Sequence, residues 1–202
     1  MWATVAFGHG GPPHSEALLW GAADQMVVAS THGLLFEDGQ WDWVCEESFG
    51  ESLPTDIVRT STSLVVASTA GLAQSQDGCD WTWNDQFDEA LIWDLATDPT
   101  TPDQLWMVTN EGIWTAEGNP LSFSLLPLPE PNAQLRAIVP LPDGELSLFG
   151  FVDGVATVWR GRNEWQSAPL PVRGGQLIAL GSDATGNVYG RFPLPNGTDE
   201  LL

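Results

Sequence analysis

A glycine followed by a short apolar segment recurs along this chain at nearly constant intervals. The glycines are Gly33, Gly71, Gly112 and Gly154, and successive members lie 38, 41 and 42 residues apart. A repeat of about 40 residues that contains several strand-like segments is typical of a fold built from successive four-stranded sheets. This repeat constrains the fold more strongly than any single motif does.

Within one repeat, apolar and polar residues alternate over short segments, as expected of β-strands. In the second repeat these segments are Ile57–Ser61, Leu64–Thr69, Leu72–Ser75 and Trp81–Trp83. We predict an all-β fold, a five-bladed β-propeller of four-stranded antiparallel blades, as a single domain over residues 1–202. The expected blades cover about 16–46, 55–84, 89–126, 133–168 and 174–202 plus 1–7.

The fifth repeat ends one strand short of a complete blade. Residues 1–7 alternate as a lone strand, and we expect this strand to pair beside Glu200, Leu201 and Leu202. Such pairing would close the ring, because proteins usually avoid an unpaired sheet edge. A closed ring predicts a monomer. The alternative is a piece of a larger propeller that closes with a second copy as a homodimer.

One turn is marked especially clearly by the sequence Ser75-Gln76-Asp77-Gly78-Cys79-Asp80-Trp81-Thr82-Trp83. Ser75 and Asp77 can bond nearby backbone amides and so fix the turn. The stretch resembles the Asp-box, Ser-x-Asp-x-Gly-x-x-Trp, of sialidase-type (BNR) and photosystem-assembly-factor-type propellers. The glycine stands one place early, with Cys79 in its usual position. The resemblance implies a folding staple, not a catalytic element.

The charge of the chain is strongly negative. The formal net charge is −21, and the sequence holds six arginines and no lysine. A phosphate backbone would be repelled, which argues against a nucleic acid partner. Two interpretations stay open, a solvated surface and a face that binds a cation or a basic partner. No apolar run approaches about 18 residues, so no membrane span is expected, and no signal peptide is recognisable at the N-terminus.

In a propeller, the crossings between blades and the turns between second and third strands lie on one face, here called the loop face. This face is the predicted binding face. Its acidic residues are Glu46, Glu47, Glu51, Asp85, Asp88, Glu89, Glu111, Glu130 and Asp153. The candidate ligand-binding residues among them are Glu46, Glu47, Glu51, Glu89, Glu111 and Asp153.

The innermost strands carry polar residues that could line a central channel. Trp20, Arg59 and Asp94 occupy what look like matching positions, and Arg136 lies one blade further along. Arg59 and Asp94 are therefore further candidates, either as a structural ion pair or as part of a ligand site.

No catalytic residues are predicted. Sialidase chemistry needs three clustered arginines, a tyrosine nucleophile with a glutamate partner, and an acid. Tyr189 is the only tyrosine, and the arginines show no such grouping. His9, His14 and His32 have no metal-site spacing, and no calcium or phosphate loop occurs. We therefore expect no metal and no cofactor.

Cys45 and Cys79 are the only cysteines. A disulfide between them would indicate an oxidising, secreted or periplasmic compartment. Without it, a cytoplasmic location is favoured. The sequence leaves the two alternatives open.

Three functions remain compatible with these observations. The first is a non-catalytic scaffold that binds a protein or small ligand on the loop face. The second is a glycan-binding or glycoside-hydrolase-like propeller, which exposure of Trp93 and Trp106 would favour. The third is a fragment or engineered propeller scaffold that closes by dimerising.

Overall fold

Five antiparallel sheets follow one another along the chain. The structure is a computed structural model, and it describes residues 15–20, 26–37, 40–49, 53–98, 100–171, 178–193 and 199–201. Sheet one contains β1 (Ser15–Trp20), β2 (Met26–Ser30), β3 (Gly33–Glu37) and β4 (Trp41–Cys45). Sheet two contains β5 (Pro54–Arg59), β6 (Leu64–Ser68), β7 (Gly71–Ser75) and β8 (Trp81–Trp83). Sheet three contains β9 (Ile92–Thr97), β10 (Leu105–Thr109), β11 (Ile113–Glu117) and β12 (Ser122–Leu126). Sheet four contains β13 (Gln134–Pro140), β14 (Leu146–Val152), β15 (Val155–Gly161) and β16 (Trp165–Pro169). Sheet five contains β17 (Ile178–Ser182), β18 (Val188–Pro193) and β19 (Asp199–Leu201).

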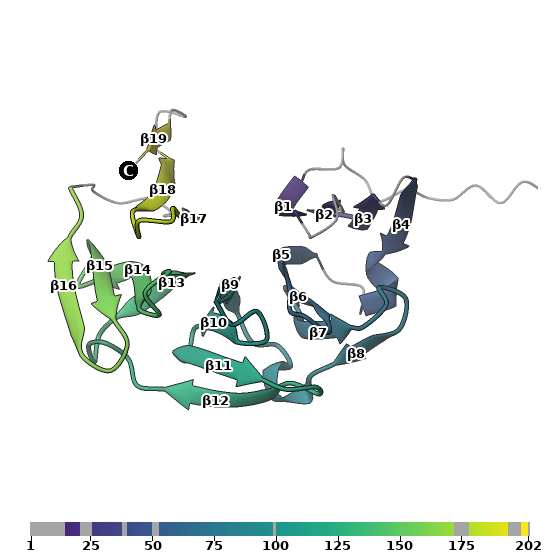
Figure 1. Ribbon diagram of the computed structural model, residues 1–202, viewed down its shortest axis with the longest axis horizontal. Coiled ribbons are helices and arrows are strands. Elements are labelled where there is room, and N and C mark those ends of the chain that lie inside the picture. Colours follow the sequence, from purple (N-terminus) through teal and green to yellow (C-terminus); the bar gives the residue numbers. More distant parts are fainter. Residues whose placement is uncertain are drawn as a thin grey trace, which may run out of the picture.

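The sheets are arranged side by side around a common axis, with the first strand of each nearest the centre (Figure 1). The first strands of neighbouring sheets contact one another in the order β1, β5, β9, β13 and β17. Sheets one and five lie on either side of an opening in the arc (Figure 1). The all-β architecture is confirmed. Residues 1–7 lie outside the described residues, so their predicted pairing with Leu201, the closure of the ring and the single-domain extent stay predictions.

Two short 3-10 helices, η2 (Glu46–Phe49) and η3 (Asp85–Phe87), lead out of the last strands of sheets one and two. Each buries a phenylalanine, Phe49 or Phe87, between neighbouring sheets. Within the described residues, no helix has the length and apolar character that a membrane crossing requires.

The hydrophobic core consists of layers between consecutive sheets. Alternate residues of each strand face the preceding or the following sheet, because side chains in a strand alternate between its two faces. Leu34 thus packs with Val66 between sheets one and two, and Trp106 packs with Trp159 between sheets three and four. Each sheet between two neighbours is therefore buried on both faces.

A β-bulge interrupts the innermost strand of every sheet at the same place. The register skips one residue in each, namely Glu16, Thr55, Trp93, Arg136 and Leu180. The residues that follow the bulge are Ala17, Asp56, Asp94, Ala137 and Gly181. These five positions are equivalent in the repeat, and the alignment of all other positions follows from them.

The repeated glycines begin the third strand of a sheet or lie in the turn before it. In sheets one and two, Ser30 and Ser68 hold this turn: each hydroxyl donates to the carbonyl of the glycine three residues on, at 3.1 and 3.2 Å. Gly71 has a φ of +131°, and a Cβ there would lie 2.3 Å from the carbonyl oxygen of Phe87. The close approach of the crossing after sheet two therefore requires glycine.

The turn over Ser75–Asp80 is stabilised as predicted. The amides of Cys79 and Asp80 donate to Asp77 Oδ1 at 2.9 and 3.0 Å, and Gly78 N donates to Ser75 Oγ at 2.9 Å. These bonds lower the pKa of Asp77, the bond from Asp80 most strongly. The residues thus have a structural role in the turn.

Candidate functional site

The candidate residues of the loop face fall into two groups. Glu89, Glu111 and Asp153 are exposed, on the crossing before β9, the β10–β11 turn and the β14–β15 turn. Glu46 and Glu47 lie in η2, but their side chains are not described, and Glu51 lies outside the described residues. Their joint role in binding therefore stays a prediction.

The backbone at each of these three exposed positions has a defined conformation or hydrogen bond. Glu89 and Asp153 have φ angles of 58° and 50°, in the left-handed region that few non-glycine residues adopt. Glu89 N donates to the Ala70 carbonyl at 3.1 Å, and Glu111 N donates to Thr109 Oγ1 at 3.0 Å. The carboxylates are thus carried on ordered turns.

A pair of carboxyl groups lies on the innermost strands of sheets two and three. Asp56 Oδ2 accepts from Leu95 N at 2.8 Å, and Asp94 Oδ2 accepts from Ile138 N at 2.7 Å. Each carboxyl thus reaches the innermost strand of the following sheet. The inner edge of that strand pairs with no other strand of its sheet, so the carboxyl accepts from one of its backbone amides. The two carboxyl groups also lie close enough to influence one another's ionisation.

The environment of this pair favours its protonated form. The carboxyl groups are enclosed by protein, although part of each residue still meets solvent. Burial raises the pKa of Asp56 to about 6, against the lowering effect of the Leu95 and Ile57 amides. Burial, and then the charge of Asp56, raise the pKa of Asp94 well above its usual value. Because ionising both would place two like charges together, the pair holds one shared proton near neutral pH.

Two bulge residues form a stacked pair close to these carboxyls in sequence. The Arg136 guanidinium lies 4.0 Å from the centroid of the Trp93 ring. Arg136 Nη1 donates to the Leu135 carbonyl at 2.8 Å, and desolvation lowers the pKa of Arg136. This cation–π contact joins sheets three and four.

Arg59 and Asp94 are not brought together. Asp94 pairs with Asp56, whereas Arg59 ends β5 and lines a pocket of about 190 Å³ with Glu37 and Asp77. The equivalent of Asp94 is Asp56, and the equivalent of Arg59 is Trp20 in sheet one and Thr97 in sheet three. The predicted match of Arg59 with Asp94 was therefore wrong by three residues. In both sheets the bulge is followed by an aspartate and two apolar residues, Asp-Ile-Val from Asp56 and Asp-Leu-Ala from Asp94. This shared pattern was the sequence signal that could have identified Asp56.

The two cysteines are free and exposed. Cys45 Sγ accepts from Trp43 Nε1 at 3.1 Å. The disulfide alternative is therefore not supported, and the argument for an oxidising compartment that depended on it falls away.

The two tryptophans that would indicate a glycan site are not open to a ligand. Trp106 is 2% exposed and packs between sheets three and four. Trp93 is half-buried and stacked against Arg136. Among the described residues, no three histidine, cysteine, aspartate or glutamate side chains converge on a metal site.

Comparison with known proteins gives a fold but no family. No family model and no curated protein matches the sequence. Among solved structures, virginiamycin B lyase from Staphylococcus aureus superposes with a TM-score of 0.69 at 7% identity, over 94% of this chain and 70% of the lyase. The fold is that of a β-propeller.

Two further propellers are similar at this level. The extracellular domain of the putative hybrid two-component system BT4673 from B. thetaiotaomicron has a TM-score of 0.67 at 15% identity, over 92% of this chain. An ancestral GH74 enzyme has a TM-score of 0.61 at 12% identity, over 94% of this chain. This chain spans 27% of the first and 32% of the second. Such low identities show the architecture alone.

Proposed function

We propose that this chain is a non-catalytic propeller that binds a positively charged segment of a protein partner at its loop face. The observation that supports this is the placement of three exposed carboxylates, those of Glu89, Glu111 and Asp153, on ordered turns of that face. The Asp56–Asp94 pair adds negative charge on the innermost strands, near the same end of the ring.

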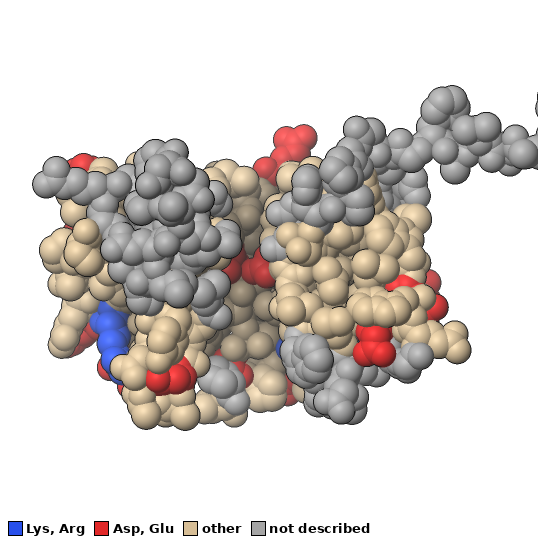
Figure 2. Space-filling model, turned by 90° about the horizontal axis from the view of Figure 1, so that it is seen from above, with Lys and Arg blue, Asp and Glu red and all other residues tan. Residues whose placement is uncertain are grey.

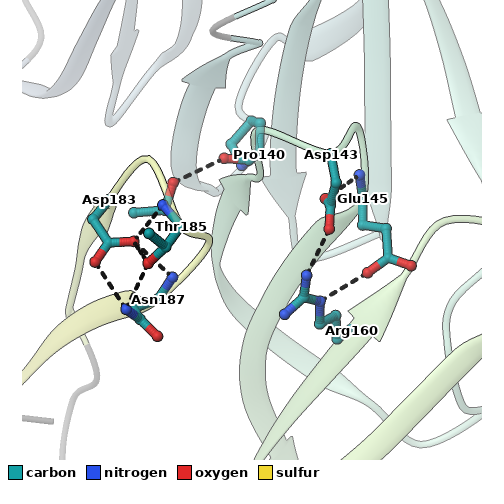
Figure 3. Close-up of polar contacts among 8 residues, drawn as sticks. Pro140, Asp143, Glu145, Arg160, Asp183, Thr185 and Asn187 are labelled. Atoms are coloured by element: carbon teal, nitrogen blue, oxygen red, sulfur yellow. Dashed lines mark hydrogen bonds and ion pairs between the residues drawn. The ribbon is translucent and has the colours of Figure 1, made fainter.

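The positions of the described ion pairs also support attraction of a positively charged partner to the loop face. The described ion pairs join Arg160 to Asp143 and Glu145, each at 2.7 Å (Figure 3). These residues lie in the β13–β14 turn and near the end of β15, at the face opposite the loop face. In the view of Figure 2, acidic side chains occur at several separate places, and the largest basic area lies at the left. Uncompensated charge of one sign accelerates the approach of an oppositely charged partner.

A pair of charge-matched variants tests the proposal. The loop-face variant carries Glu89→Gln, Glu111→Gln and Asp153→Asn. The control carries Glu117→Gln, Glu164→Gln and Asp80→Asn, three exposed residues of the opposite face. Both variants lose the same formal charge, so only position differs between them.

The probe is a fluorescent peptide of alternating arginine and glycine, measured by anisotropy against a glutamine–glycine peptide of equal length. We expect the loop-face variant to bind the arginine peptide about tenfold more weakly, whereas the control keeps affinity within about twofold of the parent. Equal weakening in both variants would show a general charge effect and refute a loop-face site. No binding by the parent would also refute the proposal.

A further inference from the structure

The first sheet has an apolar face that is exposed to solvent. Leu18, Val28, Leu35 and Trp43 are successive cross-strand neighbours in β1, β2, β3 and β4. They form one row on the face directed away from sheet two. Leu18 is 62% exposed and Trp43 is 44% exposed. We call these four residues the sheet-one row.

The equivalent rows of the next three sheets are interior on their first three strands, while the outermost member is exposed in sheets three and four. They are Ile57, Val66, Ala73 and Trp83 in sheet two, Leu95, Met107, Trp114 and Leu125 in sheet three, and Ile138, Leu148, Trp159 and Ser167 in sheet four. In each, the members on the first three strands are buried against the preceding sheet. The sheet-one row therefore has the composition and position of an inter-sheet interface.

The other end of the arc shows a corresponding feature. Val188 of sheet five packs toward sheet four, and the next residue, Tyr189, points the other way and is 50% exposed. The two end sheets flank the opening seen in Figure 1. The described part of sheet five therefore has one exposed aromatic side chain on the face directed away from sheet four.

The arc superposes on part of a longer propeller. The lyase alignment uses 94% of this chain but only 70% of the lyase, so close to a third of the lyase has no counterpart in the five sheets. That remainder is roughly the length of two repeats of about 40 residues. By this comparison, a closed ring would hold about two more sheets than the five of this chain.

We infer that the sheet-one row is a docking surface for a further propeller segment of about two four-stranded sheets. The occupant presents small and aliphatic side chains, because Val65, Ala67 and Leu72 are what sheet two presents to the equivalent row of sheet three. The inference is independent of the proposed cationic partner. It requires the row to remain open in the 202-residue chain alone.

The first test is hydroxyl-radical footprinting of the unmodified chain, with its mass measured by light scattering. We expect a monomer in which Leu18 and Trp43 are labelled several-fold faster than their equivalents Ile57 and Trp83. Protection of Leu18 and Trp43 in a monomer would show that five sheets close the ring by themselves. Protection that arises only in a dimer would make a second copy the occupant. Either outcome overturns the inference.

The second test supplies the missing sheets from the chain itself. Residues 76–169 are appended after Leu202, which adds a fourth strand to sheet five and then copies of sheets three and four. We expect this seven-sheet chain to stay monomeric and to protect Leu18 and Trp43 several-fold. An otherwise identical chain with Phe149→Asp in the appended copy only should leave them labelled, because Phe149 belongs to the face that would meet sheet one. Unchanged labelling in the folded seven-sheet chain would overturn the inference, and the footprint of the unmodified chain decides it if the extension does not fold.

Discussion

Sheets two to four and the two end sheets are joined to their neighbours in different ways. Asp56 and Asp94 tie sheet two to sheet three and sheet three to sheet four through single backbone amides. The equivalent residues in the other sheets are Ala17 in sheet one, Ala137 in sheet four and Gly181 in sheet five, and none of them has a side-chain group that can accept such a bond. Sheet five is instead joined to sheet four by Ser182 Oγ, which donates to the Pro140 carbonyl at 3.3 Å.

The comparison teaches that equal repeats need not be equally stable. The middle sheets are buried on both faces and have their inner edges bonded by carboxyl groups. Among the described residues, sheet one has the exposed Leu18 and Trp43 on one face, and sheet five packs Val188 toward sheet four and leaves Tyr189 exposed. Local stability follows buried apolar contacts and bonded backbone, so we expect it to be highest in sheets two to four and lowest in sheets one and five.

The largest difference is expected from truncating equivalent side chains in the two regions. Ile138→Ala should lower the free energy of unfolding by about 2–5 kcal/mol, because a buried aliphatic side chain leaves a cavity. The equivalent Leu18→Ala should change it by less than about 0.5 kcal/mol, because Leu18 is exposed. Urea denaturation of both variants measures the difference. Equal costs would mean that the two rows are equally buried.

A second difference concerns glycines with nearly the same φ. Gly71 and Gly181 have φ angles of +131° and +133°, but a Cβ clashes with Phe87 at the first and meets open space at the second. Gly71→Ala should cost about 2 kcal/mol more than Gly181→Ala, because only the first combines backbone strain with a steric clash. Thermal unfolding of the two variants checks this. A larger loss of stability from Gly181→Ala would contradict it.

The carboxylate ties can be removed one at a time. Asp94→Ala leaves the Ile138 amide without its acceptor, which should cost about 1–2 kcal/mol. Asp94→Asn keeps an oxygen at that position and removes one ionisable group, so its stability should equal or exceed that of the parent at pH 7. The pair of variants is compared by urea denaturation. Greater destabilisation by asparagine than by alanine would show that the charge, not the acceptor, matters.

The smallest effect is a dependence on pH. The pKa of Asp56 is about 6 in the folded chain and near 3.8 as its ordinary value. The folded state therefore binds the proton of Asp56 more tightly than the unfolded state does. The resulting stabilisation of the fold is fully present below about pH 4 and is lost as pH rises through about 6. The full shift corresponds to about 2 kcal/mol between pH 4 and 7. Because part of Asp56 meets solvent, we expect Asp56→Asn to gain about half of this, ~1 kcal/mol, relative to the parent over that range. Parallel pH profiles for the two proteins would refute the raised pKa.

The sequence was informative wherever a local rule fixed the backbone. The glycine repeat located the third strands, and Leu64–Thr69 and Trp81–Trp83 were predicted almost as β6 and β8 appear. The first strand of that sheet begins at Pro54 rather than at Ile57. The three residues before Ile57 contain the bulge, which no local sequence pattern marks. Asp56 therefore fell outside the predicted strand.

The carboxyl pair escaped prediction for a related reason. Asp56 and Asp94 lie 38 residues apart and meet only because two sheets pack with their bulges at the same level. Sequence spacing can suggest equivalent positions but does not say which side chains cross between sheets. Closure could not be predicted either, because the curvature of the arc depends on how the layers of side chains pack.

Native-state hydrogen exchange tests the difference between middle and end sheets most directly. We predict that the amides of β6, β10 and β14, together with those of Leu95 and Ile138, exchange only through global unfolding. The amides of β2 should exchange through a local opening of lower free energy that leaves sheets two to four intact. Uniform protection of all five sheets would contradict this account, because that is the behaviour of a ring whose ends are joined.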